Sequence, residues 1–323
     1  MSTLPSVNST AAPLVARLEE RAAALRVGVT RMEVGASVID AGIDHQGGID
    51  AGLLIARICM GGLGHATLRS NPTFPAWPWQ VEVRTSQPVL ACLAAQYAGW
   101  SLSFDAPKKF SALGSGPARA LAAREPLFEE LGYRDRCDSA CLVLETDRHP
   151  PAALAEKVSR DCGVDPERLT LVLTPTGSLA GVVQIAARVV EVALHKAHEI
   201  GFPLDAIVDG AGSTPLPPPI DDPLTAMGRT NDTILFGGHV HLFVSCGDEQ
   251  AEDLAQRLPS GSSKDYGKPF AEVFRDYGFD FFRIDPMLFS PARVAVTALA
   301  SGRTFHAGRL DAELLERSFG GAA

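Results

Sequence analysis

The sequence predicts a mixed α/β protein of the α+β class, arranged in two subdomains. The chain has 323 residues, which is more than one hydrophobic core usually accommodates. Stretches with helical periodicity alternate with short apolar strands, and no helix–strand unit of fixed length repeats along the chain. We place the division between an N-terminal α+β subdomain (1–174) and a C-terminal one (175–323), and a discontinuous arrangement is compatible with the pattern.

The composition is that of an ordinary globular protein. Hydrophobic residues make up 46% and charged residues 21% of the chain. The 29 Lys and Arg residues against 38 Asp and Glu residues leave a net charge of −9. This balance argues against nucleic acid as a partner, because nucleic-acid binding usually needs a basic face. It leaves room for an anionic ligand in a local positive pocket.

Three features predict a cytoplasmic protein that does not span a membrane. The first residues lack the basic and apolar regions of a signal peptide. The uncharged stretch 169–187 is long, but Thr, Pro, Gly and Gln residues interrupt it, so a strand, a turn and a helix fit better than a membrane span. The six cysteines contain no CxxC pair and are expected to be reduced core thiols.

The elements of the first half follow from periodicity and from Gly and Pro residues at their ends. For example, Gly47 and Gly48 precede an apolar helical pattern that Gly61 and Gly62 terminate. The same reasoning predicts a loose arm at 1–12, helices at 13–25, 49–59, 88–97, 126–132 and 151–162, two short strands within 27–41, and strands at 81–84, 139–145 and 169–173.

The second half begins with a long helical pattern that Ser178 caps and that runs to residue 200. Two apolar runs, 234–236 and 239–244, flank Gly237 and Gly238 and predict a hairpin or a bulged strand. The remaining expected elements are helices at 249–258, 270–277 and 311–318 and strands at 279–284 and 292–298.

A line of polar residues crosses the long apolar helix at 178–200. Steps of four, three, four and three residues place these side chains on one face: Gln184, Arg188, Glu191, His195 and His198. A buried Arg and a buried Glu are unfavourable unless they pair with each other or with a ligand. We interpret this face as the wall of an active site. The alternative is a structural ion pair, with the two histidines at the exposed end of the helix.

A second candidate site is the stretch GSGPARAL at 114–121. Free main-chain amides of Gly114, Ser115 and Gly116, together with the guanidinium of Arg119, would bind a phosphate or carboxylate group. The alternative is an ordinary helix start with a surface Arg. Further candidates for pocket residues are Arg229, Asn231 and Lys268, which stand among hydrogen-bonding groups near the ends of predicted elements.

The motifs of the common hydrolases and nucleotide-binding proteins are absent. The sequence contains no HExxH, no GxSxG elbow and no P-loop Lys. His239 and His241 would present two imidazoles on one face of a strand, but a catalytic zinc needs a third protein ligand. A carboxylate beside an Arg in an apolar setting suits a general base that activates water, and we expect neither a metal nor another cofactor.

Seven stretches together identify the chain as similar to a known family. In order, they are AGLLIARICMGGLG, PVLACLAAQYAGW, GSGPARAL, ARVVE, GRTNDTILFGG, DYGKPF and DFFRIDPMLFSPARV. The chain resembles the methenyltetrahydromethanopterin cyclohydrolases from about residue 13 to residue 320. The resemblance implies an α+β fold with two parts that face each other across a deep pocket, and a homotrimer. It also implies that the catalytic Arg and Glu of the family fall on Arg188 and Glu191.

The family resemblance implies the reversible hydrolysis of the N5,N10-methenyl cation of tetrahydromethanopterin to the N5-formyl compound, a step of one-carbon metabolism. We hypothesise that Glu191 takes a proton from the attacking water and that Arg188 orients Glu191. The site at 114–119 would hold the anionic tail of this pterin substrate, and Gln184 would line the pocket. Two alternatives stay open, a zinc-dependent amidohydrolase built on His239 and His241, and a non-catalytic pterin carrier.

Overall fold

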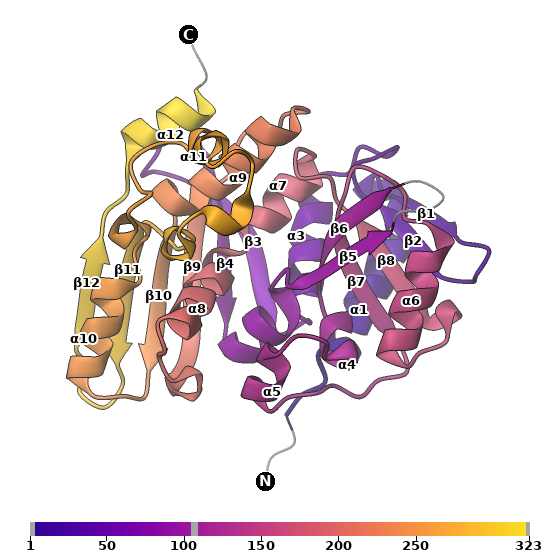
Figure 1. The fold of residues 1–323 in the computed structure, drawn as a ribbon, viewed down its shortest axis with the longest axis horizontal. Helices are drawn as coiled ribbons and strands as arrows, with labels where there is room; N and C mark the ends of the chain where they lie inside the picture. Colours follow the sequence, from indigo (N-terminus) through magenta and orange to yellow (C-terminus); the bar gives the residue numbers. More distant parts are fainter. Residues whose placement is uncertain (1–3, 105–108, 321–323) are drawn as a thin grey trace. The chain divides into compact units, whose positions relative to one another are not determined.

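Two six-stranded sheets, one in each of two units, organise the chain (Figure 1). The computed structural model describes residues 4–104 and 109–320. Unit 1 consists of residues 1–64 and 90–184, and unit 2 of residues 65–89 and 185–323. Helices and mixed sheets occur in both units, which confirms the predicted α+β class. The predicted division between residues 174 and 175 stays a prediction.

The sheet of unit 1 has apolar residues on both of its faces. Its strands, in spatial order, are β1 (Gly28–Arg31), β2 (Ser37–Asp40), β8 (Leu169–Leu173), β7 (Ala140–Glu145), β6 (Phe110–Ser115) and β5 (Trp100–Phe104). The central pairs β2–β8 and β7–β8 are parallel and the outer pairs are antiparallel. Strands buried on both faces carry continuous apolar runs, and β7 and β8 are of this kind.

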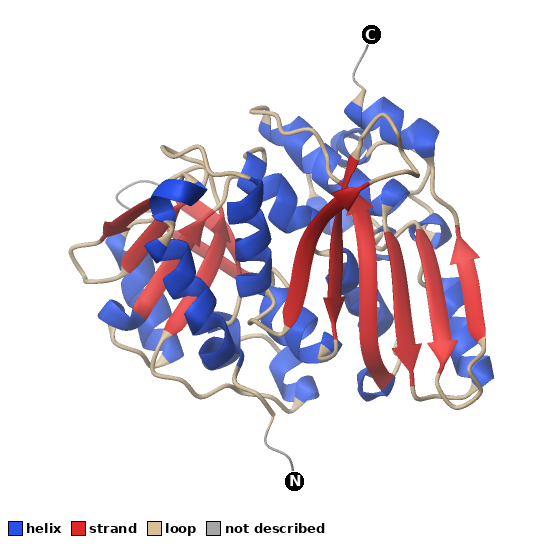
Figure 2. Ribbon diagram, turned by 180° about the vertical axis from the view of Figure 1, so that it is seen from behind, coloured by secondary structure: helices blue, strands red, loops and turns tan. Residues whose placement is uncertain are grey.

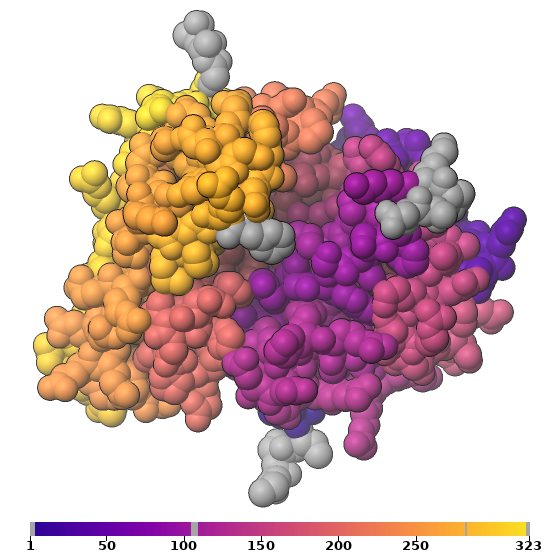
Figure 3. Space-filling view, viewed as in Figure 1, coloured from indigo at the N-terminus to yellow at the C-terminus, as the bar shows by residue number. Residues whose placement is uncertain are grey.

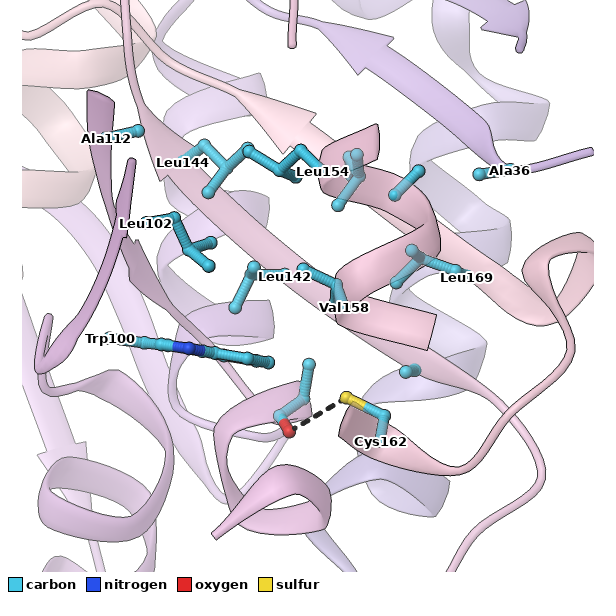
Figure 4. Packing of buried hydrophobic residues seen from close by; sticks show 14 of the residues in the cluster. Ala36, Trp100, Leu102, Ala112, Leu142, Leu144, Leu154, Val158, Cys162 and Leu169 are labelled. Atoms are coloured by element: carbon cyan, nitrogen blue, oxygen red, sulfur yellow. Dashed lines mark hydrogen bonds between the residues drawn. The ribbon is translucent and has the colours of Figure 1, made fainter. Parts of the chain in front are cut away.

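Helices cover the two faces of this sheet. On one face, Leu142 and Leu144 of β7 pack with Leu154 and Val158 of α6 (Ala152–Cys162), as Figure 4 shows. In the same cluster, the thiol of Cys162 donates to the carbonyl oxygen of Ala118. On the other face, a second cluster joins β7 and β8 to helices α1 (Val7–Glu20) and α3 (Ile49–Cys59). The remaining helices are α2 (Ala22–Leu25), the π-helix η1 (Val89–Gln96), α4 (Ala118–Ala122), α5 (Leu127–Leu131) and the short 3₁₀ turn η2 (Pro166–Arg168).

The sheet of unit 2 has a helix-covered face and a polar face. Its strands, in spatial order, are β12 (Thr304–Gly308), β11 (Arg293–Ala298), β10 (His239–Val244), β9 (Ile207–Pro215), β4 (Trp79–Thr85) and β3 (Gly64–Ser70). Along β10, Val240, Leu242 and Val244 are buried, whereas His239 and His241 are half-buried on the opposite face. In the part of the chain that the structure describes, no helix crosses this second face (Figure 2). The alternation in β10 is therefore that of a sheet covered on one side.

The helix α8 (Val189–Glu199) follows α7 (Leu179–Ala186) and packs on β9, β10 and β4. Further helices and 3₁₀ turns complete the unit: η3 (Leu204–Ala206), α9 (Pro223–Gly237), α10 (Asp248–Arg257), η4 (Ser260–Ser262), α11 (Phe270–Asp276), η5 (Phe281–Arg283), η6 (Pro286–Leu288) and α12 (Ala312–Phe319). An aromatic cluster around Phe236 and Phe270 joins α9, α11 and α12. The chain between α10 and β11 forms a continuous part of the surface of this unit, gold in Figure 3.

Four sequence-based predictions of local structure are wrong. The first helix begins at Val7, because Ser6 caps it by accepting a hydrogen bond from the N–H of Ser9 (3.0 Å). The prediction of a loose arm at 1–12 is therefore wrong for residues 7–12. Residues 1–3 lie outside the described residues. The run 234–236 is the last part of α9 and not a strand. Residues 279–284 form turns around η5, with Phe279 at φ +62°. The long helix 178–200 is two helices, separated at residues 187–188.

Several other predictions are confirmed. The helix at 49–59 and the strand at 169–173 have the predicted bounds, and the two strands within 27–41 are β1 and β2. Five strands were not predicted by the sequence analysis: β3, β5, β6, β9 and β12.

A buried carboxyl group on α9 is expected to make the stability of unit 2 depend on pH. Asp232 is fully buried and accepts a hydrogen bond from the N–H of Phe270 at the start of α11 (2.9 Å). Burial raises the pKa of Asp232 to about 7. Between pH 4 and 7 the folded protein therefore holds a proton that the unfolded chain has released, so this group's contribution to stability decreases as the pH rises through that range.

The variant Asp232→Asn removes the charge and keeps an oxygen for the Phe270 N–H. From pH 5 to pH 8, we expect the unfolding free energy of the variant to increase by roughly 2–4 kcal/mol relative to that of the parent protein. The difference in Tm between the two proteins should change in the same direction. Thermal unfolding of both proteins at the two pH values measures this difference. A constant difference would show that Asp232 does not titrate in this range.

Candidate active site

The two charged residues expected to perform the chemistry lie in contact in unit 2. α7 ends at Ala186, a turn spans Ala187 and Arg188, and α8 begins at Val189. Nη1 of Arg188 lies 3.6 Å from Oε2 of Glu191, and the two side chains are 7% and 5% exposed. Each charge compensates the other in a place where either alone would be strongly unfavourable.

The helix break gives the carboxylate a particular position. Arg188 is the N-cap residue of α8, so Glu191 is the third helical residue and lies in the first turn. The first N–H groups of a helix have no partner within it, and the positive end of the helix dipole stabilises a nearby negative charge. The spacing of three residues places Arg188 and Glu191 on adjacent parts of the helix surface. The arrangement suits an ionised carboxylate, which is the form that a general base needs in order to accept a proton.

The break also separates Gln184 from the other polar residues of the predicted line. Ser178 caps α7 as predicted, since its Oγ accepts a hydrogen bond from the N–H of Gly181 (3.0 Å). Gln184 is fully buried in unit 1, where its Nε2 donates to Oε1 of Glu145 at the end of β7 (3.4 Å). Because α7 stops at Ala186, the helical spacing no longer places Gln184 on the face of Arg188 and Glu191. The role of Gln184 as a substrate contact stays a prediction.

The glycine-rich candidate site forms the end of β6 and the turn into α4. Gly114 and Ser115 are the last residues of β6, and Gly116 has a φ of +100°, which glycine adopts without strain. The N–H of Gly116 donates to the carbonyl oxygen of Ala95 (2.8 Å), and Oγ of Ser115 lies 3.6 Å from Sγ of Cys59. The anion-binding role of this turn stays a prediction.

Arg119 is fully buried and makes protein contacts on every side. Its Nε donates to Oε1 of Glu125 (3.0 Å), and Nη2 donates to the second carboxylate oxygen. Nη1 donates to two carbonyl oxygens of η1, at 3.0 and 3.2 Å. The guanidinium carbon lies 5.2 Å from the ring centre of Tyr97 and 5.3 Å from that of Phe128. These contacts tie α4 to η1, and the role of Arg119 as an anion ligand stays a prediction.

Arg229 and Asn231 lie in the middle of α9 and not, as the sequence predicted, near the end of an element. Two nitrogens of Arg229 donate to the carbonyl oxygens of Pro218 (3.3 Å) and Phe319 (3.2 Å), and burial lowers the pKa of its guanidinium. Nδ2 of Asn231 donates to the carbonyl oxygen of Met227 one turn earlier (2.9 Å). The contacts of Arg229 therefore help to hold α9 in unit 2, whereas the bond of Asn231 lies within the helix. The roles of both residues in the pocket stay predictions.

Lys268, the last predicted pocket residue, forms an exposed ion pair with Asp276. The hydrogen bond to that carboxylate raises the pKa of the Lys268 ammonium group. Lys268 precedes α11 and Asp276 ends it, so the pair spans the length of this helix. Its role in the pocket stays a prediction.

The histidines of the alternative zinc hypothesis lie side by side on the polar face of β10. Nε2 of His241 lies 2.7 Å from Oγ1 of Thr297, and its ring stacks on Phe243. Burial lowers the pKa of both His239 and His241. Within residues 4–104 and 109–320, the set of three possible ligands with atoms within 4.8 Å of one another lies elsewhere, at Asp40, Asp44 and His149. In that set, Asp40 already accepts hydrogen bonds from four main-chain N–H groups of the following loop.

Sequence analysis missed a buried cation on α8. Lys196 is 1% exposed, and its ammonium group donates to the carbonyl oxygens of Pro259 (2.9 Å) and Met287 (2.6 Å) and to Oγ of Ser262 (2.9 Å). Burial lowers the pKa of Lys196 to about 8. The signal was present, because Lys196 follows Val189 on the apolar face at a spacing of seven residues.

The two histidines of α8 flank Lys196 in the sequence. Nε2 of His195 and Nδ1 of His198 each lie 3.9 Å from Oε1 of Glu199, and both side chains are about one-quarter exposed. Burial lowers the pKa of His195. We interpret both histidines as structural residues at the end of the helix, and this interpretation stays a prediction.

Comparison with known proteins identifies relatives over nearly the whole chain. The family model described as "Cyclohydrolase (MCH)" matches residues 6–319. The methenyltetrahydromethanopterin cyclohydrolase of Methylobacillus flagellatus is 60% identical over 319 residues, which are 99% of this chain and 97% of the relative. The proteins of the same name from Xanthobacter autotrophicus (56% identical; 98% and 93% covered) and Methanosarcina mazei (40% identical; 98% of each covered) are also similar.

The contacts of Arg119 predict a loss of stability when the guanidinium is removed. Arg119→Met leaves the carboxylate of Glu125, which is 15% exposed, without its cation. We expect this variant to lose about 3–5 kcal/mol of unfolding free energy, because breaking a buried ion pair leaves one charge uncompensated. Denaturant unfolding measures the loss.

A double variant separates this effect from simple loss of packing. Arg119→Met combined with Glu125→Gln leaves no charge behind and should be less destabilised than Arg119→Met alone. A normal stability for Arg119→Met, combined with a raised KM for an anionic substrate, would instead support the anion-binding prediction.

Proposed function

The chain belongs to the MCH cyclohydrolase family, and from that premise we propose that it hydrolyses the N5,N10-methenyl cation of tetrahydromethanopterin. The product is the N5-formyl compound, and the reaction is reversible. This places the protein in the one-carbon metabolism based on tetrahydromethanopterin. The observation within the structure that supports the proposal best is the buried contact between Arg188 and Glu191.

The substrate needs little activation, because its methenyl carbon lies between two nitrogens that share a positive charge. A water molecule that loses a proton as it attacks can add to this carbon directly. Glu191 accepts that proton, and Arg188 keeps the carboxylate ionised and oriented. General-base assistance of this kind contributes about 10² to 10⁴ to the rate.

The adduct then collapses with a balanced transfer of protons. Glu191 returns its proton to N10 as the bond between this nitrogen and the former methenyl carbon breaks. The hydroxyl group of the adduct becomes the formyl oxygen and releases its remaining proton to solvent. One water is consumed and one proton is released in each forward turnover. The scheme includes no metal and no redox cofactor.

The remaining predicted site residues have places in this proposal. The Gly114–Gly116 turn, supported by Arg119, binds the anionic tail of the substrate, while Gln184, Arg229, Asn231 and Lys268 line the pocket. The buried contacts of Arg119 favour an indirect role, in which its guanidinium holds the turn in shape instead of touching the ligand.

The central test is the substitution Glu191→Gln, which removes the base and keeps the size of the side chain. We expect kcat to fall by about 10² to 10⁴ with little change in Tm. Loss of the methenyl absorbance of the substrate measures the rate. Glu199→Gln, on the same helix but 40% exposed, is the matched control and should keep its activity. Full activity of Glu191→Gln would remove this residue from the proposed role.

The same assay separates the alternatives. If a chelator abolished hydrolysis, the result would indicate that a metal bound by His239 and His241 activates the water. Tight binding of the pterin without turnover, in the parent protein as well as in Glu191→Gln, would indicate a carrier. Chelator-resistant hydrolysis that depends on Glu191 supports the proposed mechanism.

A homotrimer and a cytoplasmic location also belong to the proposal. Among the described residues, no helix has both the length and the apolar character needed to cross a membrane. Light scattering after gel filtration is expected to give three times the chain mass of 34.2 kDa. A mass equal to that of one chain would contradict the trimer and leave the catalytic proposal untouched.

A further inference from the structure

We propose that strand β9 positions the catalytic pair. Thr214 is a positioning residue, and the first turn of α8 packs closely on Gly212 and Gly210. The inference rests on the proposed function of Arg188 and Glu191 and extends it to residues that touch neither the substrate nor the reacting atoms. All of the contacts that support it lie within unit 2.

A hydrogen bond from Thr214 stabilises the end of α7 at the helix break. The last four carbonyl groups of a helix need partners outside it. Thr214 supplies one of them, because its Oγ1 donates to the carbonyl oxygen of Ala186, the last residue of α7, at 2.9 Å. Thr214 is fully buried in β9, 28 residues further along the chain. Since water does not reach the bond, its loss would leave a buried carbonyl group without this donor.

The next contacts explain why α8 can begin directly on the strand. Gly212 and Gly210 lie on the same face of β9 as Thr214, because side chains alternate along a strand. A Cβ atom at Gly212 would lie 2.8 Å from the carbonyl oxygen of His239 and 2.9 Å from Cγ1 of Val189, and one at Gly210 would lie 3.1 Å from Cγ1 of Val190. Neither glycine has a positive φ, so close approach, and not backbone conformation, explains the missing side chains.

These contacts follow the helix break in order. Along β9, Thr214 contacts Ala186, Gly212 lies against Val189, and Gly210 lies against Val190. Arg188 lies inside this span and Glu191 directly follows it. The strand therefore determines where α7 stops and where the first turn of α8 lies, and with it the point from which the Glu191 carboxylate reaches the substrate.

The reaction is sensitive to such placement. A displacement of about 1 Å in a catalytic group can reduce the rate by about a hundredfold, because the reacting atoms must meet at near contact distance. A shift of α8 would move Arg188 and Glu191 together and leave their mutual contact intact. It would thus impair the attack of water more than the binding of the substrate.

The experiment compares Thr214→Val, Thr214→Ser and Thr230→Val with the parent protein. Valine has the shape of threonine without the hydroxyl group, whereas serine keeps the hydroxyl group. Thr230 is the matched control, because it is also buried and its Oγ1 also donates to a carbonyl oxygen at 2.9 Å, that of Ala226 within α9. For each protein, kcat and KM for the methenyl substrate and the Tm are measured.

We expect Thr214→Val to lower kcat about ten- to a hundredfold with KM changed less than about twofold. Thr214→Ser should recover kcat to within about threefold of the parent, because the hydroxyl group is restored. Thr230→Val should lower the Tm about as much as Thr214→Val and keep the parental kcat.

Two results would overturn the inference. One is a parental kcat in Thr214→Val, and the other is an equal loss of kcat in Thr214→Val and Thr230→Val, which would indicate a general effect of reduced stability. Absence of turnover in the parent protein would be a different failure, since it would refute the proposed function and with it the catalytic pair that β9 is said to position.

Discussion

The contact between Arg188 and Glu191 is the interaction on which the rest of the candidate site depends. Two opposite charges are kept almost completely away from water, and either one alone would be strongly unfavourable there. The fold accommodates them where one helix stops and another starts, so that the carboxylate lies in a first helical turn. A general base must be ionised before it can accept a proton, and it must lie within reach of the water that it activates.

The two sheets provide different surroundings. The sheet of unit 1 carries helices on both faces, and its central strands are accordingly apolar throughout. The sheet of unit 2 is packed by α8 on one face and is polar on the other, which explains why β10 alternates between valine or leucine and less buried residues. Close packing of α8 on β9 leaves little room for side chains at Gly212 and Gly210, so the strand that supports the candidate pair is poor in large side chains.

Buried cations have more than one role in this protein. Arg119 and Lys196 are fully buried, and the structure satisfies them with main-chain carbonyl oxygens and, for Arg119, with Glu125. Both tie separate segments together, which is a structural use of a charge. Arg188 differs in that its acidic partner is its neighbour on the same helix and lies at the helix start. Burial of a cation is therefore not enough to identify a catalytic residue, and the position of its partner matters as well.

The amino-acid sequence was sufficient to predict the α+β class, most of the central elements, and the choice of Arg188 and Glu191 as candidates, because hydrophobic periodicity, Gly and Pro residues and charged side chains in apolar surroundings are local signals. It did not reveal the break between α7 and α8, since helical periodicity continues through Ala187 and Arg188 with no Gly or Pro there. It also did not distinguish the end of α9 from a strand, because a short apolar run fits both. The helix break depends on contacts between residues that are distant in the chain, namely the bond from Thr214 to Ala186 and the glycine contacts of β9, and no local pattern records such contacts.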